Sequence, residues 1–220
     1  MPATNDKLIK AQSTIIKKDH GFIYRDLNKN GRLDVYEDAR QPIEARVDDL
    51  LNRMTLQEKA GTLFINGSVV NDDGSVEDRS GPHRPELVAS AQMADQCITH
   101  FNLWAIPKAR IVATWYNNLQ RFAENTRLGI PVTIASDPRN HFNNSIFNMA
   151  AVDFSQWCNA LGFGAIGDPE LVKRFAQVVR QEYLAVGIRM ALHSQIDLAT
   201  EPRWPRISGT FGEDAYHTAN

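Results

Sequence analysis

The residues with the most specific chemical pattern lie between positions 26 and 37. Oxygen-bearing side chains recur there at positions 1, 3, 5, 9 and 12 of a twelve-residue loop, with glycine at position 6. Calcium takes six to eight oxygen ligands, and this spacing, completed by a backbone carbonyl at position 7, wraps them around one ion. The candidate ligands are Asp26, Asn28, Asn30, Arg32 through its carbonyl, Asp34 and Glu37. The alternative is an Asx-rich turn that binds no metal.

The flanks of this loop differ from those of a paired EF-hand. Residues 21–26 predict extended chain rather than a helix, and Pro42 interrupts the chain soon after the loop. The pattern has no second copy in the sequence. We therefore expect one isolated EF-hand-like loop, with a structural calcium ion, in an N-terminal arm over residues 1–41.

A second polar group lies in the segment SQIDLATEPRWPRISGTFGED, residues 194–214. Apolar residues at 192 and 196–199 predict the end of a buried strand, and Pro202 and Pro205 forbid its continuation because proline donates no ladder hydrogen bond. Arg203 and Arg206 flank Trp204, and planar donors beside an aromatic face suit a sugar ring. The alternative is a surface loop whose arginines pair with nearby carboxylates, namely Glu201, Glu213 or Asp214.

A third candidate, Asp137, ends a short apolar strand predicted over residues 130–135. In a parallel α/β barrel the carboxyl ends of the strands carry the functional site, so a carboxylate there is expected to face a ligand. The alternative is that Asp137 caps the following turn.

The elements that must position these residues alternate between helices and short buried strands. Helices are predicted over 42–54, 85–95, 107–125 and 169–187, and a further helix is predicted to begin at the capping box formed by Thr55 and Glu58. Strands are predicted over 97–106, over 130–135 and in a segment after Gly187. Residues 67–85 predict a surface loop. Alternation of this kind indicates a parallel α/β architecture, which we place in one domain over residues 42–220.

Composition excludes several classes of function. The chain has 220 residues, 43% of them hydrophobic, and a formal net charge of −2, which argues against nucleic acid and anionic membranes as partners. No stretch approaches the ~20 apolar residues of a membrane span, and the start MPATNDKLIK lacks a signal-peptide pattern. We expect a soluble chain, periplasmic or secreted if a leader was removed and otherwise cytoplasmic. Cys97 and Cys158 predict two reduced, buried thiols.

Three segments together resemble glycoside hydrolase family 3, the β-glucosidase and β-xylosidase family: NRMTLQEKAGTLF, RLGIPVTIASDPRNHF and PRWPRISGTFGED. The resemblance implies a TIM-type (β/α)8 barrel and retaining hydrolysis of β-glycosides that needs no cofactor. By the same resemblance, Asp137 and Arg206 contact the sugar, Arg203 is a weaker candidate, and His141 matches a motif histidine although Phe142 replaces the usual glycine. Pro205 and Gly209 also depart from the family pattern.

The family's catalytic groups are missing from the sequence. The resemblance places the nucleophile in an SDW-like motif after a Lys-His pair, and the general acid in a following domain; neither motif occurs here. A barrel also takes about 250 residues. We therefore expect the first part of the barrel, which needs the remainder and a second domain to hydrolyse a β-linked glucoside or oligosaccharide. Two alternatives stay open, a stand-alone calcium-dependent carbohydrate-binding or structural protein and an independent hydrolase that uses Asp137 with Glu201.

Overall fold

The computed structural model describes residues 16–76, 88–103, 106–136, 140, 153–193 and 195–219. Its main element is a four-stranded parallel sheet in which spatial order follows sequence order. The strands are β3 (Ile65–Ser68), β4 (His100–Leu103), β5 (Thr133–Ser136) and β6 (Ile188–Ala191). The connecting helices are α4 (Ala89–Gln96), α5 (Ala109–Glu124), α6 (Ala160–Ile166) and α7 (Pro169–Val186). Helices between parallel strands confirm the predicted α/β class.

The hydrophobic core lies between this sheet and its helices. Phe101 and Ile134 are paired across β4 and β5, and Ile134 is paired with Ile188 on β6. All three are buried against the apolar stripe of α5, which includes Trp115 and Leu119. The rest of that stripe is Val112 and Ala123, whereas Ile111 and Phe122 of the same helix are only half-buried.

Local capping signals predicted helix starts well. Thr55 accepts a hydrogen bond from Glu58 N at 3.2 Å while the Glu58 carboxylate accepts one from Thr55 N, and this capping box opens α3 (Leu56–Gly61). Asp168 accepts from the backbone N of Leu171 at 3.1 Å at the start of α7. The helix after Pro42 is also confirmed as α2 (Ile43–Arg53).

Three predictions about the elements were incomplete or wrong. Neither α6 nor β3 was predicted from the sequence, and the last two residues of β3 lie inside the predicted loop that starts at Gly67. The strand character assigned to 196–199 was wrong, because β6 ends at Ala191 and Ile196 is 81% exposed. Instead, Ala199 N donates to Gly212 O at 2.9 Å, so the segment folds back on its own loop, which leads to α8 (Ala215–Ala219).

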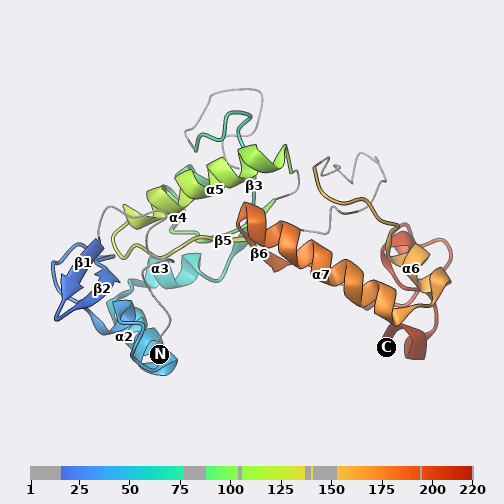
Figure 1. Cartoon of the computed structure of the whole chain (residues 1–220), viewed down its shortest axis with the longest axis horizontal. Coiled ribbons are helices and arrows are strands. Elements are labelled where there is room, and N and C mark those ends of the chain that lie inside the picture. The colour runs from blue at the N-terminus through green and yellow to red at the C-terminus, as the bar shows by residue number, and fades with distance from the viewer. Residues whose placement is uncertain are drawn as a thin grey trace.

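The described part of the N-terminal arm is an antiparallel hairpin, β1 (Ile16–Asp19) and β2 (Phe22–Arg25), followed by the Asx-rich loop and a short 3-10 helix, η1 (Val35–Glu37). The arm packs on the segment between α5 and β5, where Tyr36 Oη donates to Leu128 O at 3.3 Å. Gly129 has φ +59°, and a Cβ there would lie 2.8 Å from Leu27 O, so only glycine permits this approach. Figure 1 shows the hairpin and α2 at one end of the molecule and α6 with the C-terminus at the other.

The described helices include none that combines the length and apolar character required to cross a bilayer.

Candidate functional site

The carboxyl end of β5 is held by buried contacts with both neighbouring strands. Ser136, the last residue of β5, has no exposed surface, and its Oγ donates to Leu103 O at 3.1 Å. Its carbonyl accepts from Leu192 N at 3.1 Å. Asp137 follows directly in the sequence, but Asp137 and His141 both lie outside the described residues. Their predicted sugar contacts therefore stay predictions.

Arg203 is paired locally, as the surface-loop alternative predicted. Its side chain donates to both carboxylate oxygens of Glu201, at 2.8 and 2.9 Å, and its backbone N donates to the same carboxylate at 2.9 Å. These bonds lower the pKa of Glu201 to about 2 and raise that of Arg203. A carboxylate with so low a pKa is ionised near neutral pH, so Glu201 does not suit the role of proton donor in an independent hydrolase with Asp137.

Arg206 is presented differently from Arg203. It is exposed at the start of η3 (Ile207–Gly209) and makes no ion pair with the part of the chain that the structure describes. Trp204 between the two arginines is half-buried, and its backbone N donates to Glu201 O at 3.0 Å in a turn. Within the described part of the chain, Arg203 is therefore paired with a carboxylate and Arg206 is not.

The end of this loop is docked on α6 through a glycine. A Cβ at Gly164 would lie 1.9 Å from Phe211 O, so the helix and the loop touch through their backbones. Thr210 is fully buried, and His217 Nε2 lies 2.9 Å from Gly164 O. An open hollow of about 470 Å³ lies between α6 and this loop, with Glu213 and Asp214 in its lining. Because the hollow does not include Arg206, it does not by itself define the sugar site.

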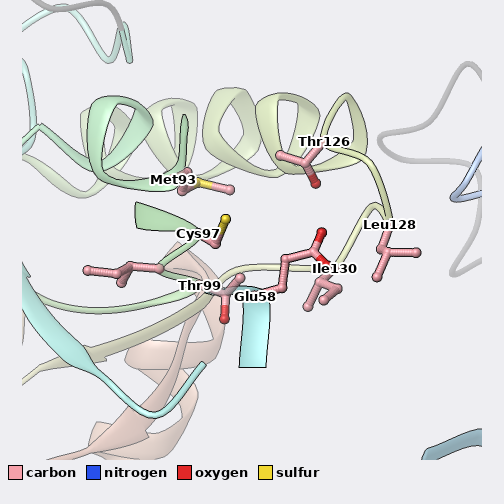
Figure 2. A pocket seen from close by; sticks show the side chains of 8 residues that line it. Glu58, Met93, Cys97, Thr99, Thr126, Leu128 and Ile130 are labelled. Carbon is pink, nitrogen blue, oxygen red and sulfur yellow. The ribbon is translucent and has the colours of Figure 1, made fainter. Parts of the chain in front are cut away.

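The more enclosed cavity lies at the opposite end of the sheet. It has a volume of about 40 Å³ and is lined by Glu58, Met93, Cys97, Ile98, Thr99, Thr126, Leu128 and Ile130. Figure 2 shows these side chains gathered from α3, the end of α4 and the segment after α5. Thr99 directly precedes β4, so the cavity lies at the amino ends of the strands. Its size suits one or two water molecules, not a sugar.

Cys97 and Cys158 are both free, as predicted, but each is half-buried rather than buried. Burial, followed by the nearby Glu58 carboxylate, raises the pKa of Cys97, so its thiol is protonated at neutral pH.

The loop over residues 26–37 curls its backbone around several of the predicted ligand oxygens. Asp26 Oδ2 accepts from Gly31 N at 2.9 Å, and Asn28 Oδ1 accepts from Asn30 N at 3.1 Å, so the backbone curls around the side-chain oxygens. Asn30 Oδ1 accepts in the same way from Arg32 N at 2.8 Å. Asp26 is 2% exposed, and its Oδ1 has no hydrogen-bond partner among the residues that the structure describes. A buried carboxylate oxygen without a protein hydrogen-bond donor, surrounded by other oxygen-bearing side chains, is suited to bind calcium.

The carboxylates of the last two predicted ligands, Asp34 and Glu37, already accept hydrogen bonds from other groups of the protein. Asp34 Oδ2 accepts from the amides of Asn28 and Asn30, each at 2.6 Å, and Glu37 accepts from Leu27 N at 2.7 Å. Burial raises the pKa of Glu37, whereas hydrogen bonds overcome the effect of burial and lower that of Asp34. In the described residues no three acidic, histidine or cysteine side chains converge as a metal cluster. The residue set fits calcium, but the carboxylates do not converge on one point.

A polar cluster that was not predicted from the sequence joins α7 to residues that follow β5. Asn140 is fully buried and donates to the carboxylate of Glu182 on α7, which also accepts from Ser155. The available signal was position 182 itself, because a carboxylate there interrupts the stripe formed by the buried Val179 and Val186. A charged side chain on a buried face requires a polar partner.

These features define the class of the molecule. It is a parallel α/β domain whose candidate ligand residues follow the carboxyl ends of its strands, the usual place for a binding site in such sheets. The model of the glycosyl hydrolase family 3 N terminal domain matches residues 107–220, about half of the chain, and the chain belongs to this family. The resemblance noted from three short segments is therefore confirmed.

Comparison with characterised relatives gives the same assignment. The chain is 48% identical over 198 residues to a periplasmic β-glucosidase/β-xylosidase of Dickeya chrysanthemi, an alignment covering 89% of this chain and 30% of that protein. It is 45% identical over 196 residues to β-glucosidase C of Emericella nidulans, covering 88% of this chain and 31% of that protein. The chain thus spans about 30% of the length of these relatives. Their names give no support to a stand-alone calcium-dependent binding protein.

Proposed function

We propose that this chain is the first part of the catalytic barrel of a retaining β-glycosidase that acts on β-glucosides or related β-linked sugars. The 48% identity to the Dickeya β-glucosidase/β-xylosidase is the observation that carries the proposal. The sheet supports it, because four sequential parallel strands are half of an eight-stranded barrel. β3 and β6 are the outer strands of this sheet, and the remaining barrel strands would pair with them.

Within that barrel, Asp137 and Arg206 are proposed to hold hydroxyl groups of the sugar next to the cleaved bond, with His141 and Arg203 in weaker roles. The nucleophile and general acid would come from outside these 220 residues. Retaining hydrolysis needs two carboxyl groups about 5 to 5.5 Å apart, one to attack the anomeric carbon and one to protonate the leaving oxygen. This chain's part is to bind and orient the sugar for that pair.

The test is hydrolysis of aryl β-glucosides and β-xylosides by the protein translated from the complete reading frame that contains this chain. We expect turnover, and we expect Asp137→Asn to lower kcat/KM by roughly 10- to 100-fold, the loss of one charged hydrogen bond. Asp72→Asn, the same change at an exposed position, is the matched control. A folded full-length protein without turnover on any β-glycoside would refute the proposal.

We also propose that the loop over residues 26–37 binds one structural calcium ion. The orphaned Asp26 Oδ1 supports this, since a cation would satisfy it. Asn28 and Asn30 would then turn their amide oxygens inward and release Asp34. The bound ion would stabilise the arm and, through Tyr36 and Leu128, the segment that leads into β5.

Thermal unfolding with calcium, magnesium or a chelator tests the calcium proposal independently of catalysis. Calcium at 100 times its dissociation constant would stabilise the folded protein by about 2.7 kcal/mol. Asp26→Asn should abolish that gain, and Asp72→Asn should keep it. A melting temperature that does not respond to calcium would show that the loop is an Asx-rich turn without metal.

A further inference from the structure

The helix α2 carries an apolar stripe that is not covered by the described part of the chain. Ile43, Val47 and Leu51 recur every four residues, so they lie on one face of the helix. Ile43 is 72% exposed, and Val47 and Leu51 are also exposed. None of the described residues of α2 is buried. Because an amphipathic helix is stabilised mainly by packing of its apolar face, the stripe indicates a contact that the described residues do not supply.

The exposed apolar surface continues along the chain after α2. Leu56, at the start of α3, is 83% exposed, and Phe64, which precedes β3, is 60% exposed. Ile65, the first residue of β3, is 45% exposed. Single apolar side chains scattered over a surface are ordinary, whereas several on consecutive elements indicate an interaction surface. The apolar face is defined here as Ile43, Val47, Leu51, Leu56, Phe64 and Ile65.

Hydrogen bonds place α3 at the amino ends of the strands. Arg127, in the segment that leads into β5, donates to Arg53 O at 2.8 Å and to the Glu58 carboxylate at 3.0 Å. Gln57 Nε2 donates to Asp95 O at 3.1 Å, on the helix that precedes β4. Figure 2 shows the Glu58 side chain in this region. The end of α2 and the whole of α3 therefore lie beside the amino ends of β4 and β5.

The apolar face ends on an outer edge of the sheet. Among the described strands β3 pairs only with β4, so its other edge has no neighbouring strand there. Asn66 on β3 donates to Gln92 of α4 at 2.7 Å, so the Asn66 side chain points toward that helix. Side chains alternate along a strand, so Ile65 points to the opposite face of the sheet, which is the interior of a barrel. A structure that continues the sheet past β3 would cover both Ile65 and this edge.

The remaining part of the same polypeptide is the group best suited to cover this face. The chain spans about 30% of the length of its relatives, so each relative has ample further chain for this purpose. A barrel strand from that further chain would pair with β3 in parallel, with its amino end beside Phe64 and Leu56. A second copy would instead place β3 beside β3, and the barrel to which the sheet belongs would stay open.

We propose that the apolar face is the docking surface for the remaining part of the same polypeptide, so that α2 and α3 close the amino end of the complete barrel. The inference rests on the proposed function, because it takes the sheet to be part of a larger barrel. It gives a role to α2, which precedes the alternating strands and helices. The candidate ligand residues follow the carboxyl ends of the strands, so this surface stabilises the barrel and does not bind the sugar.

Cysteine accessibility in the complete protein tests the docking surface. Leu56→Cys and Phe64→Cys place a thiol on the apolar face, and Asn52→Cys places one at an exposed position on the other side of α2. Each variant is alkylated with iodoacetamide, the modification is quantified at that residue by peptide mass spectrometry, and the native rate is divided by the rate in denaturant. We expect both thiols on the apolar face to react at least about tenfold more slowly than the Asn52→Cys thiol, because a covered site reacts only when it opens.

Cross-linking from Lys59 identifies the covering group. Lys59 is exposed on α3, and an amine-reactive cross-linker is applied to a mixture of unlabelled and heavy-isotope-labelled complete protein. We expect links to lysines of the same polypeptide beyond position 220. Links between light and heavy chains would show that a second copy covers the face, and links confined to Lys7 and Lys10 would show that the N-terminal residues do so. Either of these results would overturn the inference.

The outcomes separate this inference from the proposed function, because neither measurement requires turnover. Equal alkylation rates at the three positions in a protein that hydrolyses β-glucosides would overturn the docking surface alone. Protection of both apolar positions in a folded protein without turnover on any β-glycoside would overturn the proposed function and support the docking surface. If Phe64→Cys does not fold, Val47→Cys takes its place, because it lies on the same apolar face.

Discussion

Replacing Gly164 with alanine tests whether the loop after β6 is held in place by its backbone contact with α6. The new Cβ would lie 1.9 Å from Phe211 O, 2.7 Å from its carbonyl carbon and 3.2 Å from its Cα. An ordinary contact begins at 3.4 Å, so the loop must move by roughly 1.5 Å, the difference between 3.4 and 1.9 Å. Because the opposing atoms are backbone, no side-chain rotation can relieve the overlap.

The energetic balance is set by two opposing effects. Overpacking typically costs about 1–3 kcal/mol, and the severity of this overlap favours the upper end. Alanine in a helix interior gains about 0.5–1 kcal/mol over glycine. We therefore expect the free energy of unfolding to fall by about 2 kcal/mol. Urea denaturation measures this loss, and a change in the native emission of Trp204 should report that its loop has moved.

Gly162→Ala is the control on the same helix. It brings the same gain in helix propensity, but its Cβ would meet the side chain of Cys158, at 2.9 Å from Cβ and 3.2 Å from Sγ. The Cβ of Cys158 moves only with its backbone, but the shift needed to reach 3.4 Å is roughly 0.5 Å instead of 1.5 Å, so we expect a loss of about 1 kcal/mol or less. If Gly164→Ala is as stable as Gly162→Ala and leaves the Trp204 emission unchanged, the loop is not fixed by this contact.

Two further predictions concern the fold. Leu119→Ala in the core should lower the free energy of unfolding by about 2–5 kcal/mol, whereas Leu63→Ala, at a position 84% exposed, should change it by less than about 0.5 kcal/mol; equal losses in urea titrations would contradict the assigned core. Hydrogen bonds from Arg40 lower the pKa of Asp38 from 3.8 to about 2, so the ion pair stabilises the fold above pH 3.8 and its contribution disappears as the pH falls towards 2. Because Arg40 is largely exposed, solvent screening keeps this contribution small, and Asp38→Asn should remove it; an acid-denaturation profile unaffected by the substitution would refute the assignment.

Features encoded by neighbouring residues were predictable from the sequence. The capping box at Thr55 involves residues three apart, so the pattern alone located the start of α3. The pairing of Arg203 with Glu201, two residues apart, was likewise foreseen as the surface-loop alternative. The Asx-rich loop is also formed by residues close in sequence, although its pattern does not show which hydrogen-bond donors pair with its carboxylates.

Features encoded by distant residues were not predictable. β3 has the sequence INGS, which reads as a loop, and it is a strand because it pairs with β4, 35 residues away. The hydrogen bond between Asn140 and Glu182 joins residues 42 apart, and neither position carries a motif that names the other. Similarly, a strand was predicted from the apolar residues at 196–199 because the periodicity of apolar residues does not show whether a partner strand lies beside them.

The helices α6 and α7, rather than contacts within the loops, fix the two chain segments that carry the candidate ligand residues. Asn140 and Ser155, which follow β5 in the sequence, are hydrogen-bonded to Glu182 on α7, and the loop after β6 contacts Gly164 on α6. These two helices follow one another directly between β5 and β6, so one helical connection positions residues after two different strands. Among the described residues, the only contact of α5 with either loop is the hydrogen bond from Ala109 N to the carboxylate of Asp153. Ligand affinity should therefore be more sensitive to substitutions in α6 and α7 than to substitutions in α5 that destabilise the fold equally.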